Sequence, residues 1–221
     1  MRELPFTLSR RGSRDERRTS EPPFDPTSWT GALIVMGVVT ALLWGIQIAN
    51  AGDDYGFNRF GLQPRSVDGL WGILTQPFLH QSYGHLLSNT LPLVAIGWAL
   101  LLSGVRVFVF VTAVVIVLGD AATWLVAPSG QIVVGASGMI FGWAGYLLAR
   151  AFFSRRLKWI VVAVLLLVFF GTLLGGALPT GDDRVSWQSH LCGALAGVLV
   201  GWLLHPRKPA GAGRTPGAAV R

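Results

Sequence analysis

Two short motifs far apart in the chain contain residue types that can perform nucleophilic catalysis. Ser137 lies in the run Gly135-Ala136-Ser137-Gly138, and His190 is followed by Gly193 and Gly197. Each motif lies near the start of a separate apolar stretch. A polar or ionisable side chain is costly in lipid, so such a residue indicates a functional site. A serine and a histidine at one depth are the residue types of a nucleophile and its general base.

Each motif also has a purely structural interpretation. Glycine-flanked serines are common where membrane helices pack closely, and a single histidine can be a hydrogen-bonded structural residue. The two glycines after His190 follow it at spacings of three and four residues, in line with the imidazole, and Gly138 and Gly142 form a matching stripe beside Ser137. If the stripes face each other, His190 reaches Ser137, and we expect Phe141 to support the imidazole face.

Three more polar residues surround the start of another apolar stretch. His85 and Asn89 are four residues apart and share a helix face. They are either hydrogen-bonding contacts between helices or donors at a reaction site. His80 fits a loop or helix-cap position better than a catalytic one.

The sequence places no carboxylate where it could orient His190. Asp120 falls in a different apolar stretch, and Asp182 and Asp183 fall in a loop. The pattern therefore predicts a catalytic dyad rather than a triad.

The composition predicts a membrane protein. Hydrophobic residues make up 52% of the 221 residues and charged residues 13%, and the mean hydropathy is +0.53, which is unusual for a soluble domain. Six apolar stretches are each near the roughly 17 to 25 residues that a spanning helix needs; they cover about residues 30–50, 86–103, 107–127, 137–153, 159–174 and 189–205. We expect an all-α bundle of six transmembrane helices over residues 30–205, a disordered basic cytoplasmic tail over 1–29 and a flexible cytoplasmic tail over 206–221.

The basic residues predict the orientation of the bundle. Most of them fall in the two tails and the short segments 104–106 and 150–158, which places both termini in the cytoplasm. The net charge of +7 then reflects topology and contact with anionic lipids. We expect no nucleic-acid partner, because the chain lacks a surface of interleaved basic and aromatic residues. In this topology the second, fourth and sixth spans begin outside, so His85, Ser137 and His190 share an external layer.

Taken together, these motifs resemble the rhomboid intramembrane serine proteases, and the resemblance covers roughly residues 30–205. It implies that Ser137 is the nucleophile and His190 the general base. It also implies that an oxyanion hole is formed by His85, Asn89 and the Ser137 amide. The residues that match supporting positions of the family are His80, Phe141, Gly135, Gly138, Gly193 and Gly197.

The resemblance implies cleavage of single-span membrane proteins near the external face, without a metal or cofactor. Membrane lipids and such substrates are the expected partners, in a bacterial plasma membrane, with the fifth span and the 175–186 loop as gate and lid. The chain departs from the family at Trp71-Gly72 in the long external loop 51–83, where the family usually has Trp-Arg.

Two other classes of function remain open from the sequence. A catalytically silent relative of the same fold would bind membrane clients, but both dyad residues are present here. A small transporter would also place polar residues in spans. The polar residues gather at one face instead of lining a path, and no symmetric pair of broken helices is apparent.

Overall fold

A computed structural model of the protein describes residues 25–179 and 186–205. Most of the predicted N-terminal tail, the whole predicted C-terminal tail and residues 180–185 of the proposed lid lie outside the described residues.

Six long helical segments lie at the six predicted apolar stretches. They are α1 (Trp29–Gly52), α3 (Tyr83–Leu101), a composite third segment, α6 (Ser137–Ser154), α7 (Leu157–Leu174) and α8 (Trp187–Leu204). The third segment consists of α4 (Val105–Val114), a π-helical turn η4 (Val115–Gly119) and α5 (Asp120–Val126). In the described part of the chain, β-structure is limited to one antiparallel bridge between Leu62 and Val133.

Length and hydropathy identify four of these segments as candidate membrane spans: Trp29–Gly52, Tyr83–Leu101, Val105–Val126 and Trp187–Leu204. α7 contributes a shorter apolar stretch, Leu157–Thr172. α6 is less apolar, because it contains Ser137, three glycines and Arg150. The helical fold class is confirmed, whereas the count of six spans remains a proposal.

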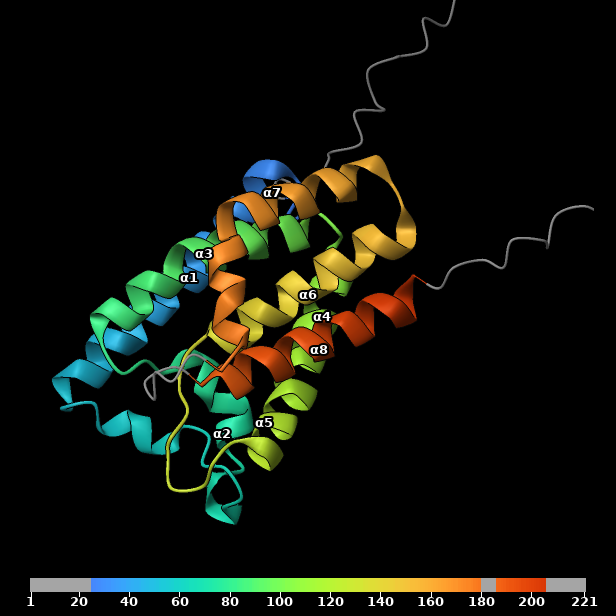
Figure 1. Ribbon diagram of the computed structural model, residues 1–221. Helices are drawn as coiled ribbons and strands as arrows, with labels where there is room; N and C mark the ends of the chain where they lie inside the picture. The colour runs from blue at the N-terminus through green and yellow to red at the C-terminus, as the bar shows by residue number, and fades with distance from the viewer. Residues whose placement is uncertain (1–24, 180–185, 206–221) are drawn as a thin grey trace, which may run out of the picture.

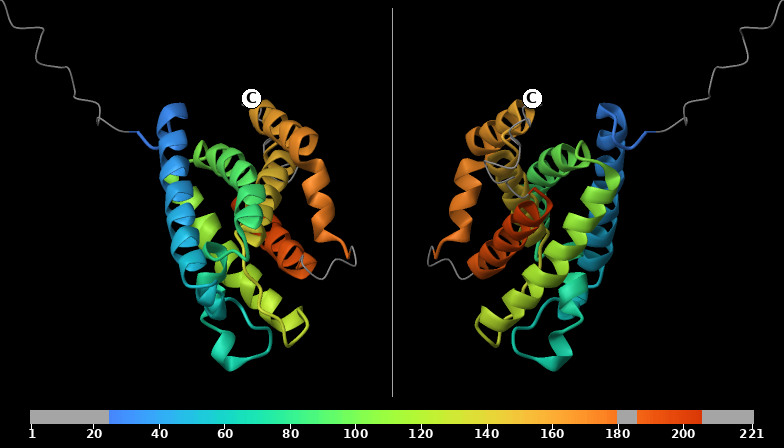
Figure 2. Two further views of the ribbon diagram at one scale, coloured as in Figure 1. Left: turned by 90° about the vertical axis from the view of Figure 1, so that its left-hand side faces the viewer. Right: turned by 90° about the vertical axis from the view of Figure 1, so that its right-hand side faces the viewer.

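α6 is the centre of the bundle. Its most extensive contact is with α8, and it also packs against α3, α4 and α7, while α1 packs on α3. Figure 2 shows α1 (blue) and α7 (orange) on opposite flanks of the molecule, and Figure 1 gives the labels of these helices. The α6–α7 turn lies at one end of the molecule, and the segment from η1 to η3 lies at the other together with the end of α5 (Figure 2).

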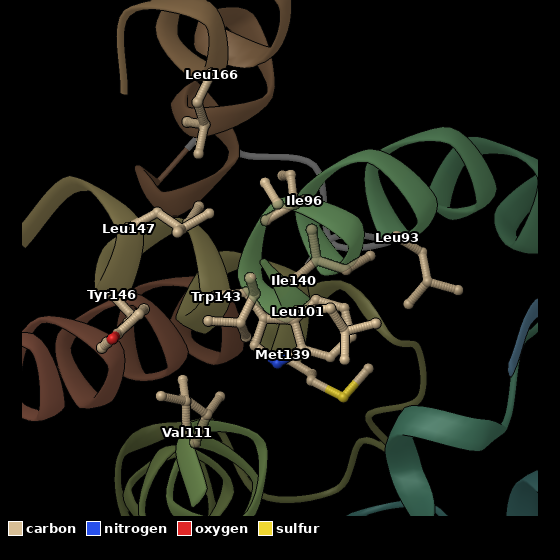
Figure 3. Close-up of a cluster of buried hydrophobic side chains, with 14 of the residues drawn as sticks. Leu93, Ile96, Leu101, Val111, Met139, Ile140, Trp143, Tyr146, Leu147 and Leu166 are labelled. Carbon is tan, nitrogen blue, oxygen red and sulfur yellow. The ribbon is translucent and has the colours of Figure 1, made fainter. Parts of the chain in front are cut away.

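The buried core surrounds the middle of α6. Figure 3 shows Ile96 of α3, Leu147 of α6 and Leu166 of α7 converging on one side, and Val111 of α4 approaching from the other. Trp143 is fully buried at the centre, and its indole N–H donates to Thr112 Oγ1 at 3.0 Å. The core therefore fixes α6, the helix that begins with Ser137.

The long loop between α1 and α3 is ordered by short helices and backbone contacts. It contains η1 (Gly56–Phe60), η2 (Val67–Gly69), α2 (Gly72–Thr75) and η3 (Gln76–Phe78). Leu62 and Val133 exchange two backbone hydrogen bonds of 2.9 and 2.8 Å, which tie the loop to the segment before α6. A Cβ at Gly72 would lie 2.2 Å from Leu62 Cα. The close approach of this backbone explains the glycine, since a longer side chain has no room there.

Candidate active site

Ser137 and His190 are in direct contact in the structure. The Oγ atom of Ser137 lies 2.7 Å from Nε2 of His190. Ser137 is the first residue of α6, and His190 lies in the first turn of α8. The half-buried serine and the buried histidine thus come together where two packed helices begin.

The contact made by the other ring nitrogen of His190 determines which nitrogen carries the hydrogen. Nδ1 lies 2.9 Å from the carbonyl oxygen of Gly176, in the short helix η5 (Gly175–Ala177). A carbonyl only accepts, so Nδ1 carries the hydrogen and Nε2 is free to accept from the serine hydroxyl. Phe141 stacks on the imidazole with ring centroids 4.2 Å apart and an interplanar angle of 5°. The ring is therefore held by its edge and its face, and a carbonyl takes the position that a carboxylate occupies in a triad.

The glycine stripes of α6 and α8 face each other and set this distance. A Cβ at Gly193 would lie 2.1 Å from the carbonyl oxygen of Gly138, and one at Gly197 would lie 1.8 Å from that of Gly142. No side chain fits between these backbones. The four glycines allow the close approach of the helices that brings His190 to Ser137.

The segment before Ser137 brings a third element to the site. Gly135 has a φ of +131°, a conformation that L side chains rarely adopt. A Cβ at this position would lie 2.8 Å from Cε1 of His85 and 3.7 Å from Oγ of Ser137. His85, in the first turn of α3, therefore lies beside the serine.

Asn89 follows His85 by one turn on α3 and is buried. Its side-chain Nδ2 has no hydrogen-bond partner in the structure. A buried donor without an acceptor is costly, and the N–H of Asn89, one turn from His85, is an unpaired donor in the described part of the chain.

His80 contacts the backbone immediately before Ser137. Its Nε2 accepts a hydrogen bond from the backbone N–H of Ala136 at 3.3 Å, and its ring packs edge-on against His85 at 5.1 Å between centroids. Burial, with a smaller effect from His85, lowers the pKa of His80 to about 3. The ring is thus neutral and can accept from the amide next to Ser137.

Three residues that hold the backbone of the site were not predicted from the sequence. Asn50, at the end of α1, donates to the His80 carbonyl at 3.3 Å and accepts from the N–H of Phe57 at 3.0 Å. Asn58 donates to the same carbonyl at 3.4 Å. The Gln76 carbonyl accepts from the N–H of Gly135 at 2.9 Å. The polar Asn50 at the end of an apolar stretch was the one available signal, because the other contacts depend on how the loop folds.

Comparison with known proteins identifies the family. Residues 67–207 match the family model described as the Rhomboid domain, and this range contains every predicted site residue.

Bacterial relatives extend the similarity to nearly the whole chain. An uncharacterized protein of Mycobacterium tuberculosis is 35% identical over 219 residues, which cover 96% of this chain and 91% of the relative. An uncharacterized protein of Mycobacterium leprae is 35% identical over 183 residues, covering 80% and 72%. A Bacillus subtilis protein with the name "Putative rhomboid protease YdcA" is 28% identical over 145 residues, covering 62% and 69%.

Proposed function

This chain belongs to the rhomboid family, and from that premise we propose that it is a serine endopeptidase that cleaves single-span membrane proteins near the external face of the membrane. The observation that carries the proposal is the 2.7 Å contact between Ser137 Oγ and His190 Nε2, with Nδ1 engaged by the Gly176 carbonyl. A hydroxyl in contact with an unprotonated ring nitrogen is the arrangement of an activated nucleophile.

In the proposed reaction, Ser137 Oγ attacks the carbonyl carbon of the scissile peptide bond while His190 Nε2 takes the hydroxyl proton. His190 then gives this proton to the leaving amine as the C–N bond breaks, which leaves an ester on Ser137. A water molecule attacks the ester carbonyl carbon while His190 Nε2 takes its proton, and His190 returns this proton to Ser137 Oγ as the bond between the acyl carbon and Ser137 Oγ breaks and the acid product leaves. Proton transfer through one imidazole accounts for both halves of the reaction.

The oxyanion that forms in each half needs hydrogen-bond donors. We assign this role to His85, Asn89 and the backbone N–H of Ser137. Two features support the assignment: His85 lies against Gly135 beside the serine, and the buried Asn89 Nδ2 has no hydrogen-bond partner among the described residues. Donors held in a buried site stabilise developing charge more strongly than they would in water.

A lateral route for substrate is supported by an apolar cavity between α3, α6 and α7. Its volume is about 240 Å³, and its lining includes Ile96, Leu147, Leu166 and Phe170. α7 packs mainly on α6 and makes few contacts with α3, so the side of α7 that faces α3 can separate from α3 with little loss of packing. We propose that α7 is the gate that admits a substrate helix from the lipid.

The apolar helices and the family indicate an integral membrane protein. The mycobacterial relatives support a bacterial membrane as its location. The distribution of basic residues supports cytoplasmic termini, and the site then opens to the outside.

Reconstitution with a reporter tests the function. Purified protein in liposomes should cleave a tagged single-span reporter, and Ser137→Ala or His190→Ala should abolish cleavage while the protein stays folded. Nearly the whole chemical contribution is lost with either residue, because the two act as a unit. Cleavage that persists in folded Ser137→Ala, with contaminating proteases excluded, would overturn the proposal and favour a client-binding role.

A further inference from the structure

A cluster of cations lies at the end of the bundle opposite to Ser137. Arg150 lies near the end of α6, and Arg155, Arg156 and Lys158 occupy the α6–α7 turn. Arg150 follows Ser137 by 13 positions, which is about 20 Å along a helix. His205 joins the cluster from the end of α8.

Arg150 is held in one orientation within this cluster. Its Nη1 donates to the Tyr146 hydroxyl at 2.8 Å, and its guanidinium carbon lies 3.8 Å from the centroid of Trp159. The Tyr146 hydroxyl is also 3.2 Å from Nε2 of His205. Contacts from α6, α7 and α8 therefore hold the half-buried guanidinium of Arg150 in one position.

The cluster has no counterion in the described part of the chain. The titratable groups that interact with Arg150 are Tyr146, whose hydroxyl is neutral, and Arg156, and those that interact with His205 are Arg150 and Arg156. No carboxylate of the described residues is among them. A partly buried cation without an anion is unfavourable, because no ion pair offsets the free-energy cost of removing water from the charge.

Neighbouring donors also lack acceptors. Nε of Arg150, Nε1 of Trp159 and Oγ of Ser154 are buried and have no hydrogen-bond partner among the residues that the structure describes. Two of these groups only donate. The local chemistry thus has an excess of donors and positive charge, which an anion with several oxygen atoms would balance.

We propose that this cationic cluster binds the phosphate group of an anionic phospholipid in the cytoplasmic leaflet. Guanidinium is the side chain best suited to bind phosphate through paired N–H donors. The exposed residues around the cluster favour a lipid as the source, because Leu157, Ile160 and Val161 present apolar surface against which acyl chains can lie. The positive-inside rule places this end at the cytoplasmic leaflet, whose anionic lipids attract such clusters.

Lipid binding to the full-length protein in detergent tests the proposal. Phosphatidylglycerol and phosphatidylcholine are titrated separately, and retained lipid is measured by native mass spectrometry. The variants are Arg150→Gln and Arg156→Gln. The matched control is Arg106→Gln, an exposed residue of α4 that removes the same charge.

We expect the parent to retain phosphatidylglycerol in preference to phosphatidylcholine. Each cluster variant should weaken phosphatidylglycerol binding by about tenfold, the loss expected for one charge-assisted hydrogen bond, and Arg106→Gln should leave it unchanged. If Arg150→Gln fails to fold, the exposed Arg156 carries the test. Equal retention of both lipids, or equal losses in all three variants, would overturn the proposal.

Inorganic phosphate separates the two sources of the anion. Phosphatidylglycerol that stays bound in excess inorganic phosphate supports the lipid assignment. Complete displacement by inorganic phosphate would overturn the lipid assignment in favour of a free anion. No proteolysis is measured, so failure here is distinct from failure of the proposed protease function.

Discussion

The imidazole of His190 makes one contact on each side, with Ser137 Oγ at 2.7 Å and the Gly176 carbonyl at 2.9 Å. The carbonyl fixes the tautomer as a carboxylate would, but it carries no full charge to stabilise the imidazolium that forms during attack. Stacking on Phe141 restricts the ring further. The proposed catalytic dyad therefore depends on the fixed orientation of His190 more than on a charged third residue.

The proposed oxyanion donors give a first prediction. Removing one such donor typically costs on the order of 10²-fold to 10³-fold in turnover. We therefore expect His85→Ala and Asn89→Ala each to lower reporter cleavage by that factor while some activity remains. Thermal unfolding of the same preparations is the control. A loss of folded protein that matches the loss of activity would instead assign these residues to contacts between helices.

His80 gives a prediction about acid stability. Its pKa is lowered to about 3 by burial, and the ordinary value is 6.5. Between these values the unfolded chain binds a proton that the folded chain does not, so stability falls as the pH decreases through this window and is fully present above it. We expect the melting temperature of the parent to fall more steeply below about pH 6.5 than that of His80→Gln, whose amide can accept the same hydrogen bond without titrating. Parallel acid limbs in the two proteins would contradict this role.

The close packing of α8 against α6 gives a further prediction. A Cβ at Gly197 would lie 1.8 Å from the Gly142 carbonyl oxygen, so Gly197→Ala must force α8 away from α6. Overpacking of this kind costs about 1–3 kcal/mol or more, and we expect a lower melting temperature together with lost cleavage. Gly171→Ala in α7 is the matched control, because a Cβ there meets nothing within 4 Å. Its melting temperature should equal or exceed that of the parent, and equal losses in the two variants would refute the packing argument.

Sequence spacing was sufficient for contacts that depend on regular helices. The three- and four-residue spacings made a contact between the stripe containing Gly193 and the one containing Gly138 a condition for the dyad, and the structure has this contact. The π-helical turn at Val115–Gly119 was not predicted, because its residues are as apolar as those around it. The Gly176 carbonyl and the Leu62–Val133 bridge were also missed. These are backbone contacts between distant segments, and side-chain type does not encode them.

The packing of the loop between α1 and α3 explains why a glycine follows Trp71 in this chain. The glycine lies under the backbone of Leu62, and the loop is tied to the bundle by other bonds. The Arg65 guanidinium donates to the Ala127 carbonyl at 2.8 Å, and the Trp124 indole donates to the Ser66 carbonyl at 2.9 Å. Backbone contacts and contacts with the α5 segment thus hold this loop with a glycine at position 72.

The molecule as a whole has two chemically distinct ends. The Ser137 site lies at one end of α6, and the Arg150 cluster lies near the other. The positive-inside rule predicts that the cationic end faces the cytoplasm. Catalysis is therefore proposed at the external side and lipid binding at the internal side of one bundle.

Topology mapping tests this assignment. Reporters fused to the two termini should both be cytoplasmic, and a tag in the 175–186 loop should be accessible from outside in intact cells. Six crossings give this pattern, since an even number returns the chain to the side on which it began. An external N-terminus would contradict the six-span arrangement and the placement of the site at the outer face.

The central claim is that His190 activates Ser137 as a nucleophile, and covalent labelling tests it most directly. A serine-directed fluorophosphonate should modify the folded parent in liposomes, with mass spectrometry locating the adduct on Ser137. Ser137→Ala should not be labelled, and labelling of His190→Ala should fall strongly, because an unassisted hydroxyl is a poor nucleophile. An adduct on another residue of the parent, or equal labelling in folded His190→Ala, would contradict the account.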